Sequence, residues 1–153
     1  MRLEDLRGRT AVVTGAGSGI GEGAARYAAS LGMKVVLADV AAERLDAVAA
    51  DLRAGGAAVL AVPTDVRDAA AVDALAEAAY AEFGEVTVLL NNAVSSRRFH
   101  VGGARRRVAA GDRCELLGVF HGIRSFVPRM GADPRPSHIV NTCSVGGIAI
   151  TRG

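Results

Sequence analysis

The sequence has no long hydrophobic run and no apolar leader. Its apolar stretches all fall short of the roughly 18 consecutive residues that a membrane-spanning helix needs. The N-terminal residues, MRLEDLRGRT, are charged and lack the apolar core of a signal peptide. We therefore expect a cytoplasmic protein with no membrane partner.

Cysteine is scarce, and its placement argues against two kinds of site. Cys114 and Cys143 are the 2 cysteines of the 153-residue chain, and they show no metal-binding spacing. In a cytoplasmic protein we expect both to be free thiols. The sequence therefore predicts neither a disulfide framework nor a metal site.

Lysine is nearly absent, because Lys34 is the single lysine among 18 basic residues. Six arginines lie between Val94 and Glu115 beside two acids, so that segment carries +4 and the rest of the chain −2. Such a cluster suggests nucleic acid, but Phe99 is its one aromatic residue and the remainder is acidic. We expect no nucleic-acid partner.

Short apolar runs alternate with amphipathic segments along the chain, which is long enough for one α/β domain over residues 1–153. Strands that are apolar throughout and alternate with helices predict a parallel sheet covered on both faces. We expect a Rossmann-type, doubly wound sheet with strand order 3-2-1-4-5. The predicted strands are 10–14, 34–39, 57–62, 86–90 and 138–142, and the predicted helices are 20–31, 42–54, 69–83 and one from 112 onward.

Apolar residues recur every three or four positions in the helices, which predicts one apolar face on each. On the first helix this face is Ile20, Ala24, Tyr27, Ala28 and Leu31; on the last it is Leu116, Phe120, Ile123, Val127 and Met130. Asp112 and Glu115 have capping-box spacing, and Pro128 is expected to bend or end the last helix. The helix over 116–130 is also a candidate surface for homo-oligomers.

Four glycines, at positions 15, 17, 19 and 21, separate the first strand from the first helix. Glycine lets the backbone turn sharply and lets an anion come close, because no Cβ stands in the way. The free N–H groups and the positive dipole end of the following helix favour a phosphate there. Flexible turns are also rich in glycine, but the strand before and the helix after favour a phosphate site.

An acid ends the second predicted strand. Asp39 lies 24 residues after Gly15 and 18 after Gly21, a spacing at which a carboxylate accepts the hydroxyls of an adenosine ribose. The same charge repels the 2′-phosphate of NADP, so NAD is the expected cofactor. Arg44 lies inside the next helix and is not expected to clamp a 2′-phosphate. Taken alone, Asp39 also fits an ordinary surface turn.

Several motifs resemble those of the short-chain dehydrogenase/reductase family. TGAGSGIG at 14–21 matches the family's TGxxxGxG signature, and Asp39 stands where the family has its NAD-selecting acid. Asp65-Val66 resembles the pair that contacts adenine. Asn91-Asn92-Ala93 resembles NNAG, with Val94 in place of the glycine.

Two later stretches extend the resemblance to about residues 8–93 and 116–150. LGVF at 117–120 is similar to the start of the family's interface helix, and IVNTCS at 139–144 to the strand that ends in its catalytic serine. The resemblance implies hydride transfer between NAD and an alcohol or ketone, with Ser144 orienting the substrate oxygen. It implies these cofactor-binding residues: Gly15, Ser18, Gly19, Ile20, Gly21, Asp39, Asp65, Val66, Asn91 and Ala93.

The family's acid/base tyrosine and the lysine four residues after it have no counterpart in these 153 residues. Neither tyrosine is followed by lysine at YxxxK spacing, and Glu115 stands where the family has a catalytic asparagine. We expect a truncated chain that does not turn over alone. The alternative is a non-catalytic dinucleotide-binding fragment or a non-functional product, and we expect self-association through the last strand's edge or the helix over 116–130.

Ser144 also raises the question of a serine hydrolase. It has no GxSxG context, and His138 begins the strand whose other end carries it. We expect the histidines, His121 included, to be ordinary surface or half-buried residues.

The segment from about 94 to 115 breaks the pattern on both sides of it. It is rich in arginine, glycine and alanine, which shifted GC-rich codons produce. One hypothesis is an out-of-frame reading of family-like DNA, which sequencing the source gene tests; the alternative is a divergent surface loop. A structureless stretch of this length is unusual inside a compact domain.

Overall fold

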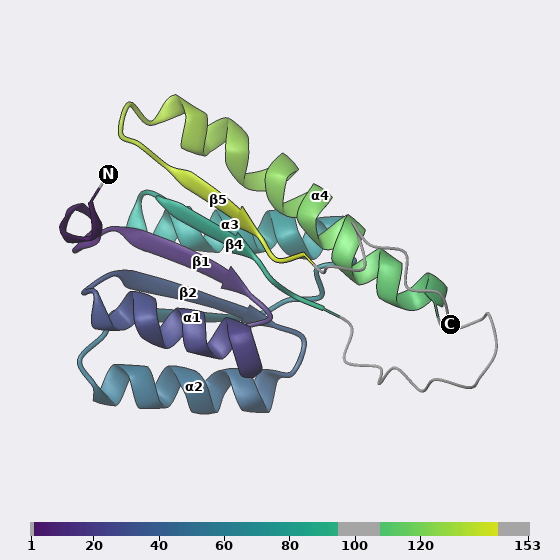
Figure 1. The fold of residues 1–153 in the computed structure, drawn as a ribbon, viewed down its shortest axis with the longest axis horizontal. Helices are drawn as coiled ribbons and strands as arrows, with labels where there is room; N and C mark the ends of the chain where they lie inside the picture. Colours follow the sequence, from purple (N-terminus) through teal and green to yellow (C-terminus); the bar gives the residue numbers. More distant parts are fainter. Residues whose placement is uncertain (1, 95–107, 144–153) are drawn as a thin grey trace.

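The computed structural model describes residues 2–94 and 108–143, and within them a parallel β-sheet has helices on both faces (Figure 1). A short 3-10 helix, η1 (Leu3–Leu6), precedes the first strand. The strands are β1 (Thr10–Thr14), β2 (Lys34–Asp39), β3 (Val59–Pro63), β4 (Val88–Asn91) and β5 (His138–Asn141). The helices are α1 (Gly19–Ser30), α2 (Ala42–Ala54), α3 (Ala69–Phe83) and α4 (Val108–Ala132).

The sheet order is β3-β2-β1-β4-β5, and every neighbouring pair is parallel. In this register Val12 of β1 lies opposite Val36 of β2 and Leu89 of β4. The predicted Rossmann-type order is therefore confirmed. The order reverses between β1 and β4, which is where an open α/β sheet leaves a crevice at its carboxyl edge.

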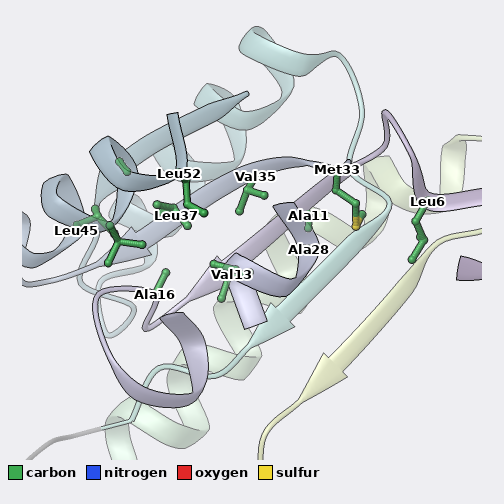
Figure 2. Packing of buried hydrophobic residues seen from close by; sticks show 13 residues of the cluster. Leu6, Ala11, Val13, Ala16, Ala28, Met33, Val35, Leu37, Leu45 and Leu52 are labelled. Carbon is green, nitrogen blue, oxygen red and sulfur yellow. The ribbon is translucent and has the colours of Figure 1, made fainter. Parts of the chain in front are cut away.

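Two apolar clusters fix the helices to the sheet. Val35 and Leu37 of β2 face α1 and α2, where Leu45 is fully buried (Figure 2). Val36 and Ala38, the alternate residues of the same strand, face α3 and α4, where Phe126 is fully buried. Burying one such large side chain contributes about 1.5–3 kcal/mol, so these clusters position the helices.

The predicted face of α1 is partly wrong. Ile20 and Tyr27 are 74% and 57% exposed, whereas Gly21, Ala25 and Ala28 are buried against the sheet. Small residues let the helix backbone approach the strands closely, so the larger side chains point outward. Helices α2 and α3 each bury one apolar face, as their periodicity predicts. The buried residues are Leu45, Val48, Ala49 and Leu52 on α2, and Val72, Leu75, Ala76 and Ala79 on α3.

Helix α4 corrects three expectations. It starts at Val108, so Asp112 lies inside it and is not its N-cap. It continues past Pro128 to Ala132, so Pro128 does not end it, and the expected bend stays a prediction. Residues 108–115 of the irregular segment are therefore helical, and residues 95–107 lie outside the described part. The alternative of a divergent loop over that whole segment is wrong for residues 108–115.

The apolar stripe expected to be buried on α4 mostly faces outward. Leu116, Phe120 and Ile123 are exposed, while Met130 is buried as expected. The buried side is built from Gly118, His121, Gly122 and Phe126 instead. None of the helices in the described residues is both long and apolar enough to cross a membrane.

Candidate functional site

The turn between β1 and α1 requires glycine. Gly15 has φ of +68°, and a Cβ there would lie 2.8 Å from Cα of Ala93. A Cβ on Gly21 would lie 2.6 Å from Nδ2 of Asn92. The glycines therefore let the turn lie directly against the chain that leaves β4.

The exposed start of α1 lies beyond this turn. Ser18 is the N-cap residue, and its side chain makes no capping hydrogen bond. Gly19 and Ile20 follow it at the surface, and a Cβ on Gly19 would meet no atom within 4 Å. Backbone N–H groups in a first helical turn have no partner within the helix. The space above Gly19 is open, so an anionic group has room there.

Asp39, at the end of β2, is tied to the same turn. Its Oδ2 accepts a hydrogen bond from the Gly17 N–H at 3.0 Å, and its Oδ1 accepts one from the Ala41 N–H at 2.9 Å. Nη2 of Arg44 on α2 lies 4.0 Å from Oδ1. The carboxylate thus sits beside the glycine turn with a fixed orientation, and each oxygen keeps a lone pair for another donor.

Thr14 joins the ends of β1 and β4. Its hydroxyl accepts hydrogen bonds from the N–H groups of Asn92 (2.9 Å) and Ala93 (3.1 Å) and donates to the Leu90 carbonyl (3.3 Å). The Thr142 hydroxyl, after β5, donates to Oδ1 of Asn92 at 3.1 Å. Sequence reasoning gave neither threonine a role, because these partners lie 50 to 79 residues away.

Asn91 faces inward rather than toward the crevice. Its Nδ2 donates to Oδ1 of Asn141 on β5 at 2.9 Å, and its own Oδ1 is buried without a hydrogen-bond partner. The same amide lies against Gly122 of α4. Its backbone, with that of Asn92 and Ala93, remains at the carboxyl edge of β4.

The loop after β3 carries an ion pair and a buried valine. Arg67 donates to both carboxylate oxygens of Asp65, at 2.9 Å from Nε and 2.6 Å from Nη2. These hydrogen bonds lower the pKa of Asp65, which therefore stays charged at neutral pH. The next residue, Val66, is buried, and its carbonyl oxygen lies 2.9 Å from Nδ1 of His121.

Cys114 of α4 lies beside the chain that leaves β4. Its Sγ lies 3.8 Å from the carbonyl oxygen of Ala93. Burial raises the pKa of this thiol, so it stays protonated near neutral pH. Among residues 2–94 and 108–143, no group of three or more His, Cys, Asp or Glu side chains has the arrangement to hold a metal ion.

The structure brings the predicted residues to one edge of the sheet. Gly15 lies against Ala93, and the Gly17 N–H donates to the Asp39 carboxylate. The Thr64 N–H donates to the Asp39 carbonyl at 2.9 Å. That last bond places the loop of Asp65 and Val66 next to the end of β2. Ser144 lies outside the described residues, so its predicted position is not part of this geometry.

Comparisons with known proteins identify the family. The sequence profile described as short chain dehydrogenase matches residues 9–151. The chain belongs to the short-chain dehydrogenase family. The resemblance expected from the motifs is confirmed.

Curated short-chain dehydrogenases match nearly the whole chain. The 1-deoxy-11-beta-hydroxypentalenate dehydrogenase of Streptomyces avermitilis is 37% identical over 156 residues, which cover 97% of this chain and 56% of that protein. The C alpha-dehydrogenase of Sphingobium sp. is 34% identical over 150 residues, covering 95% of this chain and 48% of that protein. The chain therefore spans about half the length of these relatives.

Solved structures of this family share the fold. A short chain dehydrogenase/reductase from Burkholderia phymatum, in complex with NAD, has a TM-score of 0.87 and 45% identity over 94% of this chain and 52% of that one. The apo form of LigD from Sphingobium sp. has a TM-score of 0.86 and 34% identity over 94% of this chain and 62% of that one.

Proposed function

We propose that this chain binds NAD(H) at the carboxyl edge of its sheet, as the dinucleotide-binding part of an alcohol or ketone oxidoreductase. One observation carries the proposal: the Gly17 N–H donates a hydrogen bond to the Asp39 carboxylate, so the glycine turn and the acid are in direct contact. The open space above Gly19 fits a pyrophosphate, and the NAD complex of the Burkholderia phymatum relative supports this ligand class.

Each part of the dinucleotide has a matching group. We assign the pyrophosphate to the turn and helix start formed by Gly15, Ser18, Gly19, Ile20 and Gly21. The Asp39 carboxylate would accept hydrogen bonds from the ribose hydroxyls. The adenine and the nicotinamide would contact the chain segments that follow β3 and β4. Asp65 and Val66 would contact adenine, with the charged Asp65 accepting from its amino group. The backbone of Asn91 and Ala93 would lie toward the nicotinamide side.

We also propose that Asp39 makes NAD the preferred cofactor over NADP. Its negative charge would lie beside a 2′-phosphate on the ribose, and Nη2 of the exposed Arg44 side chain lies 4.0 Å from the same carboxylate. Like charges placed this close repel each other, which disfavours the phosphorylated ribose.

The bound nicotinamide supplies or accepts the hydride in this chemistry. Ser144 would orient the substrate oxygen, and the substrate class would be a small alcohol or ketone. Because the 153 residues contain no YxxxK motif, we expect this chain alone to bind the cofactor without turning substrate over. The second candidate, a non-catalytic dinucleotide-binding protein, is favoured by the same absence. We place the chain in the cytoplasm and treat residues 1–153 as one domain.

Calorimetric titration with NADH and NADPH tests the binding proposal. Wild-type chain should bind NADH more tightly, and Asp39→Ser should weaken NADH binding about tenfold or more, since a hydrogen bond to a charged group contributes about 1.5–3 kcal/mol. NADPH affinity should fall less or rise. Asp46→Ser, an exposed acid on the same helix as Arg44, should change neither. Wild-type chain without affinity for either dinucleotide would refute the proposal.

Turnover is tested separately by an alcohol-oxidation screen with NAD. We expect no rate from this chain alone. A rate of alcohol oxidation that Ser144→Ala abolishes would contradict the hypothesis that the chain is non-catalytic, and it would establish a role for Ser144.

A further inference from the structure

We infer that His121 is a positioning residue for the adenine end of the dinucleotide site. It holds the loop of Asp65 and Val66 in place through the carbonyl oxygen of Val66. This inference rests on the proposed NAD(H) binding, and it concerns a residue that makes no direct contact with the proposed ligand.

The hydrogen bond itself is well placed for this role. Nδ1 of His121 lies 2.9 Å from the Val66 carbonyl oxygen. A carbonyl oxygen only accepts, so Nδ1 carries the hydrogen and donates it. His121 is 8% exposed and Val66 5% exposed, so water does not replace this bond if it is lost. Removing the donor would leave a buried carbonyl unpaired, which is costly.

A second contact from the same helix fixes the same residue. Gly118 lies almost one turn before His121 on α4, and a Cβ on Gly118 would lie 2.9 Å from Cγ2 of Val66. The helix backbone therefore lies directly against the valine side chain. One face of α4 thus sets both the side-chain position and the carbonyl direction of Val66.

The start of the loop is tied to β2, because the Thr64 N–H donates to the Asp39 carbonyl at 2.9 Å. The polar contacts of Asp65 that follow are made within the loop. Arg67 binds the Asp65 carboxylate from two residues away, and the Asp65 carbonyl accepts the Asp68 N–H at 3.0 Å. These contacts are internal, so they set the shape of the loop but not its position. Because Val66 is the buried anchor, a shift of Val66 would carry the Asp65 carboxylate away from the base.

A histidine that only fills space would behave differently. Space filling needs the ring volume but no N–H, and its loss would weaken all ligands alike. A positioning role predicts a change in the choice of base, because the Asp65 carboxylate favours the adenine amino group and disfavours a carbonyl at the same ring position.

The experiment compares NADH with reduced nicotinamide hypoxanthine dinucleotide, which carries oxygen in place of that amino group. Titrations use the full chain with His121→Phe, which keeps a ring without the donor, and His121→Asn, which keeps an N–H near the position of Nδ1. Wild-type chain should prefer NADH. His121→Phe should weaken the binding of NADH about tenfold, which is the scale of one buried hydrogen bond, but the binding of the analogue only about twofold. His121→Asn should recover most of the preference for NADH.

Ser125→Ala is the matched control, because it removes a different hydrogen bond from α4, the one to Asp73 of α3. It should leave the NADH preference unchanged. If His121→Phe does not fold, His121→Asn alone tests the inference. A preference for NADH that this variant keeps would support the inference, and a preference that it loses would overturn it. Wild-type chain that binds NADH while His121→Phe keeps the full preference refutes this inference alone. Wild-type chain that binds neither dinucleotide refutes the proposed function itself.

Discussion

Two glycines of α1 illustrate how position, rather than residue type, decides a requirement. Gly21 is buried against the chain that leaves β4, and a Cβ there would lie 2.6 Å from Nδ2 of Asn92. Gly23 lies two residues later at the surface, where a Cβ would meet nothing within 4 Å. Glycine is therefore required at position 21, whereas at position 23 it only lowers the stability of the helix.

This contrast predicts opposite effects of one substitution. Gly21→Ala should lower the free energy of unfolding by about 1–3 kcal/mol, because the added methyl would overlap the backbone carbonyl oxygen of Gly15 as well as Nδ2 of Asn92. Gly23→Ala should raise it by about 0.5–1 kcal/mol, because alanine loses less backbone freedom in a helix. Chemical denaturation measures both. A destabilised Gly23→Ala variant, or a neutral Gly21→Ala variant, would contradict the packing described for α1.

At the scale of elements, a buried carboxylate joins the starts of β1 and β4. Oε1 of Glu85 accepts the Thr10 N–H at 2.7 Å, Oε2 accepts the Thr87 hydroxyl at 2.6 Å, and Nε of Arg9 lies 3.4 Å from Oε2. Burial by itself raises the pKa of Glu85, but the hydrogen bonds from Thr87 and Thr10 together with the Arg9 charge outweigh it, so the pKa of Glu85 is lowered. The network therefore requires the ionised form.

The lowered pKa of Glu85 sets a direction for pH dependence. A group whose folded-state pKa is depressed stabilises the fold above its unfolded pKa, and this stabilisation is lost as the pH falls through the folded value. Wild-type chain should be more stable than Glu85→Gln at pH 7, and the difference should shrink below about pH 4. Urea unfolding of both proteins at pH 7 and at a pH below about 4 measures this difference in stability. Glu43→Gln, an exposed acid on α2, should show no such trend, and a difference independent of pH would contradict the network.

At the scale of the whole molecule, the outward stripe of α4 is apolar and lies on the helix side away from the core. Leu116 and Phe120 are 71% and 57% exposed, and Ile139 and Val140 of the edge strand β5 are exposed as well. Exposed apolar patches and unpaired strand edges favour association. We therefore propose self-association, with α4 as the first candidate surface.

Sedimentation of the full chain tests this proposal. Wild-type chain should associate in a concentration-dependent manner, and Phe120→Glu should weaken association about tenfold or more, because one buried aromatic side chain contributes about 1.5–3 kcal/mol. Asp46→Ser on α2, which packs on the other face of the sheet, is a surface control that should not change it. Association that survives Phe120→Glu would point to the β5 edge, and a stable wild-type monomer would refute both surfaces.

How far prediction from sequence reaches depends on the range of the contacts. The strands, the glycine turn and the acid at the end of β2 follow from local pattern, because apolar runs and glycine spacing are properties of neighbouring residues. The strand order follows from the general handedness of β-α-β connections. The buried faces of α1 and α4 did not follow. On α1 small residues pack inward and Ile20 and Tyr27 point outward, and on α4 Leu116 and Phe120 point outward although Phe126 and Met130 are buried. Hydrophobicity alone therefore selected part of the wrong side on each helix.

Sequence alone determined the strands and the residues near their carboxyl ends, since each arises within a few positions of chain. The handedness rule for β-α-β connections then predicted the order of the strands. Only the tertiary structure decided which side chains hold them together. The bonds of His121 to Val66, Asn92 to Thr14 and Glu85 to Thr10 join residues 55, 78 and 75 positions apart. No local pattern encodes a partner at that distance, because the fold must first bring the two strands or the helix and loop together.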